Sequence, residues 1–193
     1  MRSASLRYIV QRFVLFNFLM IGLLIGCTTT DITPNNDDSL QATFLTLKSP
    51  NHDIPSSGTF GWETAHTQLF ADERLVDTGI EQMIRKSLVD SLNEKRFFLT
   101  NHQPDITIGF VAALESALSH DAINQIYGID PGWIPKNHGN HFETGTIIVD
   151  VFNANRQIIW RGAIQGDTNL DIDNKTRQKR IEAAIYNLMR SFP

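Results

Sequence analysis

The chain has 193 residues, of which 41% are hydrophobic and 20% are charged, and its formal net charge is −4 at pH 7. This composition is typical of a globular protein, and the chain has no internal repeat and no long low-complexity tract. The excess of acidic side chains argues against general nucleic-acid binding, because phosphates require a basic surface.

The first 26 residues are predicted to be an export signal. Arg2, Arg7 and Arg12 are basic, no acidic residue accompanies them, and an apolar run follows over Phe13–Ile25, interrupted only by Asn17. A run of this length suits the hydrophobic segment of a signal peptide, whereas a membrane-spanning helix needs about 20 residues. An uncleaved membrane anchor would therefore be short.

The apolar run ends in Leu24-Ile25-Gly26-Cys27, which resembles the lipobox of bacterial lipoproteins. Leu24, Ile25 and Gly26 are the predicted recognition residues of the lipoprotein signal peptidase, and Cys27 is the predicted lipid attachment site. Ordinary signal peptidase prefers an Ala-x-Ala-like site, which is missing here. Cys27 is the only cysteine, so the chain has no disulfide framework. Two or three acyl chains on Cys27 would anchor the protein stably.

Cleavage before Cys27 would leave 14 basic and 21 acidic side chains, a net charge near −7. Thr28 follows the cysteine, where Asp would favour retention in the inner membrane, so we expect the outer membrane, facing the periplasm. The predicted domains are a signal peptide over residues 1–26, a lipidated cysteine and flexible tether over 27–39, and one globular domain over 40–193.

The first half of the globular part is predicted to hold strands around one helix. Residues 40–47, 59–62 and 104–115 have strand patterns, and residues 97–99 carry the chain back to the core. Asp77 is the predicted N-cap of a helix that runs to about Arg96. Its apolar stripe consists of Ile80, Ile84, Leu88 and Leu92, with Met83 beside it.

The second half is predicted to be an irregular loop, a β-hairpin and a helix. Residues 116–142 are rich in glycine and proline, and a loop of this length is usually functional or disordered. Two apolar runs, Ile147–Phe152 and Ile158–Ile164, flank an Asn-rich turn and predict the central hairpin. Asp150 and Arg161 indicate that one face of this hairpin is partly wet. The last helix is expected from about Lys175 to Ser191, with Asp173 or Asn174 as its N-cap.

The predicted fold class is α+β. We expect a two-layer sandwich in which a mixed or antiparallel sheet of about four strands has two helices on one face.

The residues that carry a resemblance to a known family are SGTFGW at 57–62, the helix 80–99, PDITIGF at 104–110 and GTIIVDVFNANRQIIWRG at 145–162. On these stretches the chain resembles the lipoproteins of domain of unknown function family 4136. The resemblance implies an exported envelope lipoprotein of unknown activity and supplies no catalytic residues. Arg96 departs from the family, which often has Gly after the helix.

Two groups of residues could suggest a metal. His138 and His141 lie in a loop near His120 and Asp121, but a zinc site needs three or four ligands. Asp167, Asn169, Asp171 and Asp173 alternate like a calcium loop. The frame of two helices is missing, and Ile172 and Gln178 replace the required Gly and Glu. We therefore expect no metal and no cofactor, and interpret the acidic segment as a helix-capping loop.

Two other groups could suggest a ligand surface. Lys175, Arg177, Lys179 and Arg180 could meet anionic lipid headgroups, although a solvated helix face is the commoner reading. Trp160 and Arg161 could form a ligand surface, although a packed Trp beside a surface Arg is commoner.

We find no GxSxG, phosphate-loop or HExxH motif. The predicted function is a non-catalytic binding or structural lipoprotein of the envelope, held to the membrane through Cys27, with an envelope protein or lipid as partner. Its contact site would be the loop 116–142, with Trp133 at its centre. The alternative is an envelope hydrolase or metal-dependent enzyme that uses the same loop.

Overall fold

The computed structural model describes residues 42–70, 79–130, 132 and 142–193. By its contacts the chain divides into Met1–Asp38 and Ser39–Pro193, and every described residue belongs to the second unit. No helix within the described residues is both long and apolar enough to cross a membrane.

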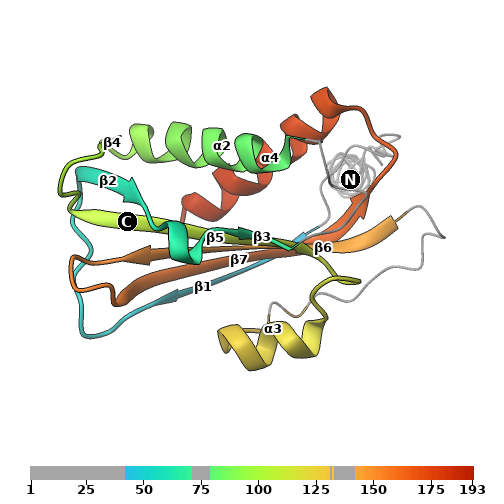
Figure 1. Ribbon diagram of the computed structural model, residues 1–193, viewed down its shortest axis with the longest axis horizontal. Coiled ribbons are helices and arrows are strands. Elements are labelled where there is room, and N and C mark those ends of the chain that lie inside the picture. The colour runs from blue at the N-terminus through green and yellow to red at the C-terminus, as the bar shows by residue number, and fades with distance from the viewer. Residues whose placement is uncertain (1–41, 71–78, 131, 133–141) are drawn as a thin grey trace, which may run out of the picture. The chain divides into compact units, whose positions relative to one another are not determined.

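A seven-stranded mixed sheet organises the domain (Figure 1). The strands are β1 Ala42–Lys48, β2 Gly58–Trp62, β3 Gln68–Leu69, β4 Phe97–Leu99, β5 Ile106–Leu114, β6 Phe142–Phe152 and β7 Ile158–Asn169. The helices are η1 Thr64–His66, α2 Ile80–Glu94, α3 His120–Tyr127 and α4 Asn174–Met189, of which η1 is a single 3-10 turn.

The sheet order is β1-β7-β6-β5-β2-β4, and β3 also pairs with β5. Pairs within β1, β7, β6 and β5 are antiparallel, whereas β2 with β4, β2 with β5 and β3 with β5 are parallel. The α+β class is confirmed, and the expected number of strands was too small. β3 and β4 have two and three residues, too few to show the alternation that identifies a strand.

The central hairpin is confirmed and is longer than predicted. β6 and β7 pair from Phe142 opposite Asn169 to Phe152 opposite Ile158. Asn153 closes the turn, because its side-chain oxygen accepts hydrogen bonds from the backbone N–H of Asn155 at 2.9 Å and of Gln157 at 3.0 Å. This is the local bonding for which Asn is favoured in turns.

α2 and α4 cover one face of the sheet, as predicted (Figure 1). The apolar stripe of α2 meets that of α4 over the inward residues of β5, β6 and β7. Trp160 is 1% exposed and packs edge to face with Phe192 at 5.5 Å between ring centroids. Gly162 makes room for this ring, because a Cβ there would lie 2.3 Å from a carbon of Trp160.

The opposite face carries α3, which corrects two predictions: residues 116–142 are not irregular throughout, and helices do not occupy one face only. The Ser119 side chain accepts a hydrogen bond from the Ala122 N–H at 3.3 Å, and Gly128 ends the helix at φ 64°. Ile123 and Ile129 are buried against Val111, Ala113, Ile148 and Ala163 of the sheet. This apolar contact supplies the free energy that holds the helix in place.

Both ends of α2 differ from the prediction. The helix is capped by Gly79 at φ 72°, not by Asp77, which lies outside the described residues. It ends at Glu94, and Arg96 then adopts φ 65°. Left-handed backbone after a helix favours glycine, so Arg96 stands at a position that glycine would occupy with less strain.

Candidate functional site

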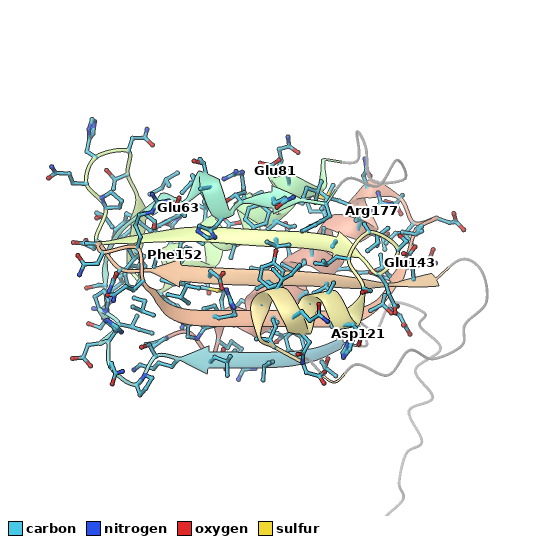
Figure 2. All side chains as sticks on the ribbon, turned by 60° about the horizontal axis from the view of Figure 1, so that its bottom comes forward. Glu63, Glu81, Asp121, Glu143, Phe152 and Arg177 are labelled. Carbon is cyan, nitrogen blue, oxygen red and sulfur yellow. The ribbon has the colours of Figure 1, made fainter. Side chains whose placement is uncertain are left out.

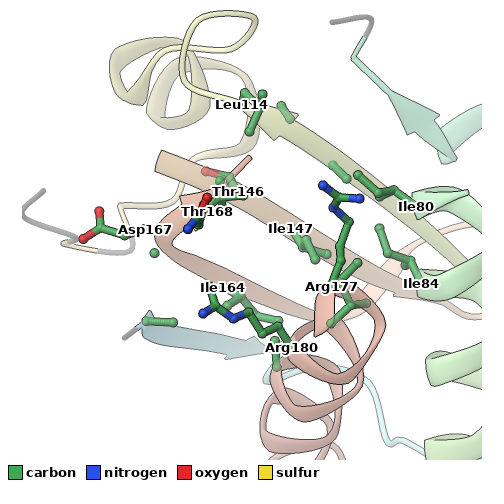
Figure 3. Close-up of a pocket in the computed structure, with 18 of the residues that line it drawn as sticks. Ile80, Ile84, Leu114, Thr146, Ile147, Ile164, Asp167, Thr168, Arg177 and Arg180 are labelled. Carbon is green, nitrogen blue, oxygen red and sulfur yellow. The ribbon is translucent and has the colours of Figure 1, made fainter. Parts of the chain in front are cut away.

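A half-enclosed apolar pocket of about 120 Å³ lies between the sheet and the first turns of α2 and α4 (Figure 3). Its floor includes Ala112 of β5, Ile147 of β6 and Ile164 of β7, and its walls include Ile80 and Ile84 of α2 and Ile181 and Ala184 of α4. All of these contacts are aliphatic, so the pocket suits an apolar group.

The pocket exists because small residues meet at this end of the sheet. Gly145 of β6 pairs directly with Gly166 of β7, and both line the pocket together with Ala42, Ala112 and Ala184. Glycine and alanine cannot fill the space under two helices, whereas a well-packed interior has few voids larger than a water molecule.

Two arginines of α4 also line the pocket. Arg177 donates hydrogen bonds to the Asn174 Oδ1 at 2.6 Å and to the Leu170 carbonyl at 3.1 Å. Figure 3 shows its side chain reaching from α4 toward Ile80 of α2. Arg180 and the carboxylate of Asp167 complete the charged part of the lining. Among the residues that the structure describes, the charged groups of the lining are therefore two guanidinium groups and one carboxylate.

The four basic residues at the start of α4, which the sequence groups together, lie in two different environments. Arg177 and Arg180 are half-buried in the pocket wall, whereas Lys175 and Lys179 are exposed. The pattern is explained by the helical repeat, since positions three apart share a face.

The acidic segment before α4 caps the helix. Asp173 Oδ1 accepts hydrogen bonds from the N–H groups of Lys175 at 2.9 Å and Thr176 at 3.1 Å, and Oδ2 accepts from the Thr176 hydroxyl at 2.7 Å. These bonds favour the ionised carboxylate and lower the pKa of Asp173 below its ordinary value. The predicted capping by Asp173 is confirmed.

Asp150 and Arg161 form a second polar site on the face that carries α3. Arg161 makes two hydrogen bonds to the Asp150 carboxylate, from Nε and Nη2, each 2.6 Å long, and a third to the Tyr127 carbonyl. The expectation that this face is partly wet was wrong for these residues, because Asp150 is only 5% exposed. Burial raises the pKa of the Tyr127 hydroxyl, and the Asp150 carboxylate acts in the same direction.

In Figure 2, α3 lies over only part of this face of the sheet, and Glu63 and Phe152 are labelled to one side of it. The His66 ring of η1 packs on Phe152 at 4.9 Å between ring centroids, and Glu63 pairs with Arg156 at 2.9 Å. These groups are contacts between secondary-structure elements. Trp160 lies on the other face, so Trp160 and Arg161 do not share a ligand surface.

Several predicted site residues lie outside the described part of the chain: Leu24, Ile25, Gly26, Cys27, Trp133, His138 and His141. The described His120 lies 3.1 Å from a carboxylate oxygen of Asp130. Within the described ranges, no group of three or more His, Cys, Asp or Glu side chains could hold a metal ion. The function of residues 116–142 as a contact site stays a prediction.

Comparison with protein families decides the relationship. Residues 46–193 match the model of a domain of unknown function, DUF4136. The chain belongs to this family. The family match covers the whole sheet except the first residues of β1, and it includes every helix described above. A comparison with curated proteins gives no match.

Three solved structures are distant neighbours. Two are PelC dodecamers from Paraburkholderia phytofirmans, each 7% identical, with TM-scores of 0.43 and 0.42, and each alignment covers 77% of this chain and 95% of that one. The third is a PDZ domain protein from Parabacteroides distasonis, 11% identical, with a TM-score of 0.45 over 79% of this chain and 36% of that one.

The sequence reasoning missed the pocket. Its apolar lining comes from positions that were identified as core, such as Ile80 and Ile181, and its small residues include Gly145 opposite Gly166, with the Thr168 hydroxyl 2.3 Å from where a Cβ of Gly145 would lie. Both glycines are visible in the sequence, but their pairing depends on the register of β6 with β7. Counting residues outward along both strands from the hairpin turn could have predicted that Gly145 pairs with Gly166.

Proposed function

We propose that this protein is a lipid-anchored, non-catalytic binding component of the bacterial envelope, attached at the outer membrane and facing the periplasm. The observation that carries the binding function is the apolar pocket under the first turns of α2 and α4. Pockets that bind small ligands are mostly apolar with a few placed polar groups, and this lining has that composition.

The chemistry of the lining supports binding without catalysis. Its ionisable side chains are Asp167, Arg177 and Arg180, and its hydroxyls include Thr146 and Thr168. Hydrolysis by a nucleophile requires a base beside the hydroxyl, and acid–base hydrolysis requires two carboxylates or an equivalent pair. The described part of the lining offers one carboxylate and no histidine or cysteine, so an envelope hydrolase is the less supported function.

Binding is tested by titrating the domain Ser39–Pro193, which contains every described element and both apolar clusters, with 1-octanol as a neutral apolar probe. Ala184→Leu places a larger side chain in the pocket wall, and we expect it to weaken octanol binding at least tenfold. Ala183→Leu adds the same group at an exposed position of the same helix and is the control. Equal octanol binding by the two variants would overturn the pocket as the binding site.

The anchor is tested at the mature amino terminus. Mass spectrometry is expected to find an acylated Cys27 as the first residue, and Cys27→Ser is expected to leave unprocessed precursor at the inner membrane. A mature chain that begins elsewhere, or an unmodified Cys27, would contradict lipidation. Fractionation of the two membranes then tests the outer-membrane assignment from Thr28.

A further inference from the structure

We infer that the ligand of this pocket is an anionic amphiphile, a free carboxylate with one short apolar chain, whose headgroup is bound by Arg177. This inference rests on the proposed function, because it specifies the chemical class of the molecule that the pocket would take. The argument depends on the charge of the lining, the hydrogen bonds of Arg177 and the size of the apolar space.

Arg177 carries a charge that no described carboxylate balances. Its two hydrogen bonds, at 2.6 and 3.1 Å, go to the neutral oxygens of Asn174 and Leu170, and no carboxylate of the described residues lies within ion-pair distance of it. Three other arginines of the domain are paired with carboxylates: Arg85 with Glu81 at 2.8 Å, Arg156 with Glu63 at 2.9 Å and Arg161 with Asp150 at 2.6 Å. A half-buried guanidinium beside aliphatic side chains is partly desolvated, so an anion there would be bound more strongly than at an exposed position.

The two neutral contacts also fix the guanidinium in place. A guanidinium has five N–H donors in a planar fork, and the contacts with Asn174 and Leu170 use two of them. Donors remain for a carboxylate, which the fork can bind through two parallel hydrogen bonds. Because the side chain is already held, less conformational entropy is lost on binding.

The other charged groups at this end of the domain also favour an anionic ligand. Among the described lining residues, Arg180 and Asp167 carry opposite charges, and the guanidinium of Arg177 is the third charged group. Lys175 and Lys179, exposed on the same first turns of α4, raise the potential at that end, while Asp173 is already engaged by the helix cap. A cationic ligand would meet repulsion from these groups.

The apolar space sets the size of the tail. A cavity of about 150 Å³ holds one benzene molecule, so the enclosed space of about 120 Å³ holds roughly four or five carbon groups, and the rest of a longer single chain continues out through the open side of the pocket. A second acyl chain would not fit. This limit favours a free single-chain acid over a phospholipid in a bilayer, which presents two chains.

The experiment compares octanoate with 1-octanol, which have the same number of carbon atoms and differ in the charge of the headgroup. We expect the domain Ser39–Pro193 to bind octanoate roughly tenfold more tightly than 1-octanol, as expected of charge-assisted hydrogen bonds. Arg177→Gln should remove this difference, and Arg177→Lys should keep part of it because the charge remains. Lys175→Gln removes an exposed charge nearby that does not line the pocket, and should reduce the difference much less than Arg177→Gln does.

The outcomes separate this inference from the proposed function. If the domain binds neither compound, the proposed binding function fails. If it binds both equally, or if Arg177→Gln keeps the preference for octanoate, the pocket binds apolar groups and the assignment of Arg177 is overturned. Vesicles of phosphatidylglycerol distinguish the source of the ligand, because co-sedimentation of the domain that depends on Arg177 would overturn the free acid in favour of a membrane lipid.

Discussion

The two ends of the space between the sheet and α2/α4 are built from the same elements and packed in opposite ways. At the end where both helices finish, Trp160, Phe192 and Phe97 stack at 5.5 to 5.7 Å between ring centroids. At the end where both helices begin, Gly145 faces Gly166 and a pocket of about 120 Å³ remains. We refer to these as the aromatic end and the pocket end.

The difference indicates that the residues that stabilise the fold and the residues that would bind a ligand lie at opposite ends of one core. Burial of Trp160, Phe97 and Phe192 stabilises the packing of the last turns of α2 and α4 on the sheet. With the helices secured at the aromatic end, their first turns can stand over an unfilled space without loss of the fold. The same helix therefore carries Leu188 in the core and Arg177 in the pocket wall.

The largest expected effect is at the aromatic end. Trp160→Ala should lower the free energy of unfolding by ~3–5 kcal/mol, because a fully buried indole is replaced by a cavity. Urea unfolding of the domain measures this loss, with Ile158→Ala as the control, since Ile158 is 38% exposed on the same strand. Equal losses for the two variants would mean that Trp160 is not part of a packed core.

Adding volume should distinguish the two ends directly. Gly162→Ala places a Cβ 2.3 Å from a Trp160 ring carbon and 2.9 Å from Leu188 Cδ1, and should cost about 1–3 kcal/mol of stability. Ala184→Leu adds more atoms at the pocket end and should cost less than Gly162→Ala, because the added atoms enter empty space. The urea midpoints of both variants test this, and the reverse order would show that the pocket end is packed as tightly as the aromatic end.

A smaller change in the free energy of unfolding is expected for a substitution where α2 ends. Arg96 adopts φ 65°, which is unfavourable for a residue with a side chain. Arg96→Gly should therefore stabilise the domain by about 0.5 kcal/mol, after the greater flexibility of glycine in the unfolded chain is counted. A raised urea midpoint is the expected measurement, with Lys95→Gly, next to it at φ −90°, as a control that should be destabilised.

The smallest effect is expected at the start of α4, beside the pocket. The folded-state pKa of Asp173 lies below its unfolded value, so its stabilising contribution is complete above about pH 4 and is lost as the pH falls through the folded pKa. Asp173→Ala should therefore reduce stability slightly at pH 7, and the gap to the unchanged protein should narrow in acid. Urea midpoints at several pH values measure the gap, and a gap that widens in acid would contradict the capping role.

The sequence predicted the elements whose pattern is long and regular. The hairpin follows from its alternating apolar residues, and the apolar stripe of α4 follows from Ile181, Ala184, Ile185 and Leu188 at helical spacing. It missed α3, although Ser119 and Gly128 are cap residues at the correct distance, because glycines and prolines nearby favoured an irregular loop.

The pocket was harder to predict from the sequence than the strands and helices were. A pocket is an absence of side-chain volume where several strands and helices meet, so it depends on which small residues face each other. Gly145, Gly166 and Ala112 are far apart in the chain and become neighbours only through the pairing of β5, β6 and β7. The basic residues of α4 were identified, but their division into Arg177 in the wall and Lys175 outside requires the position of the helix.

The most direct test of the account is nuclear magnetic resonance of isoleucine methyl groups in the domain, recorded while octanoate is added. Isoleucines lie at the pocket end (Ile147, Ile164), at the aromatic end (Ile106, Ile159) and under α3 (Ile123). We expect saturable shifts of the Ile147 and Ile164 methyl signals, with those of Ile106, Ile159 and Ile123 unchanged. Shifts confined to the aromatic end or to the face under α3, or no shifts at all, would contradict the claim that the pocket end is the binding site.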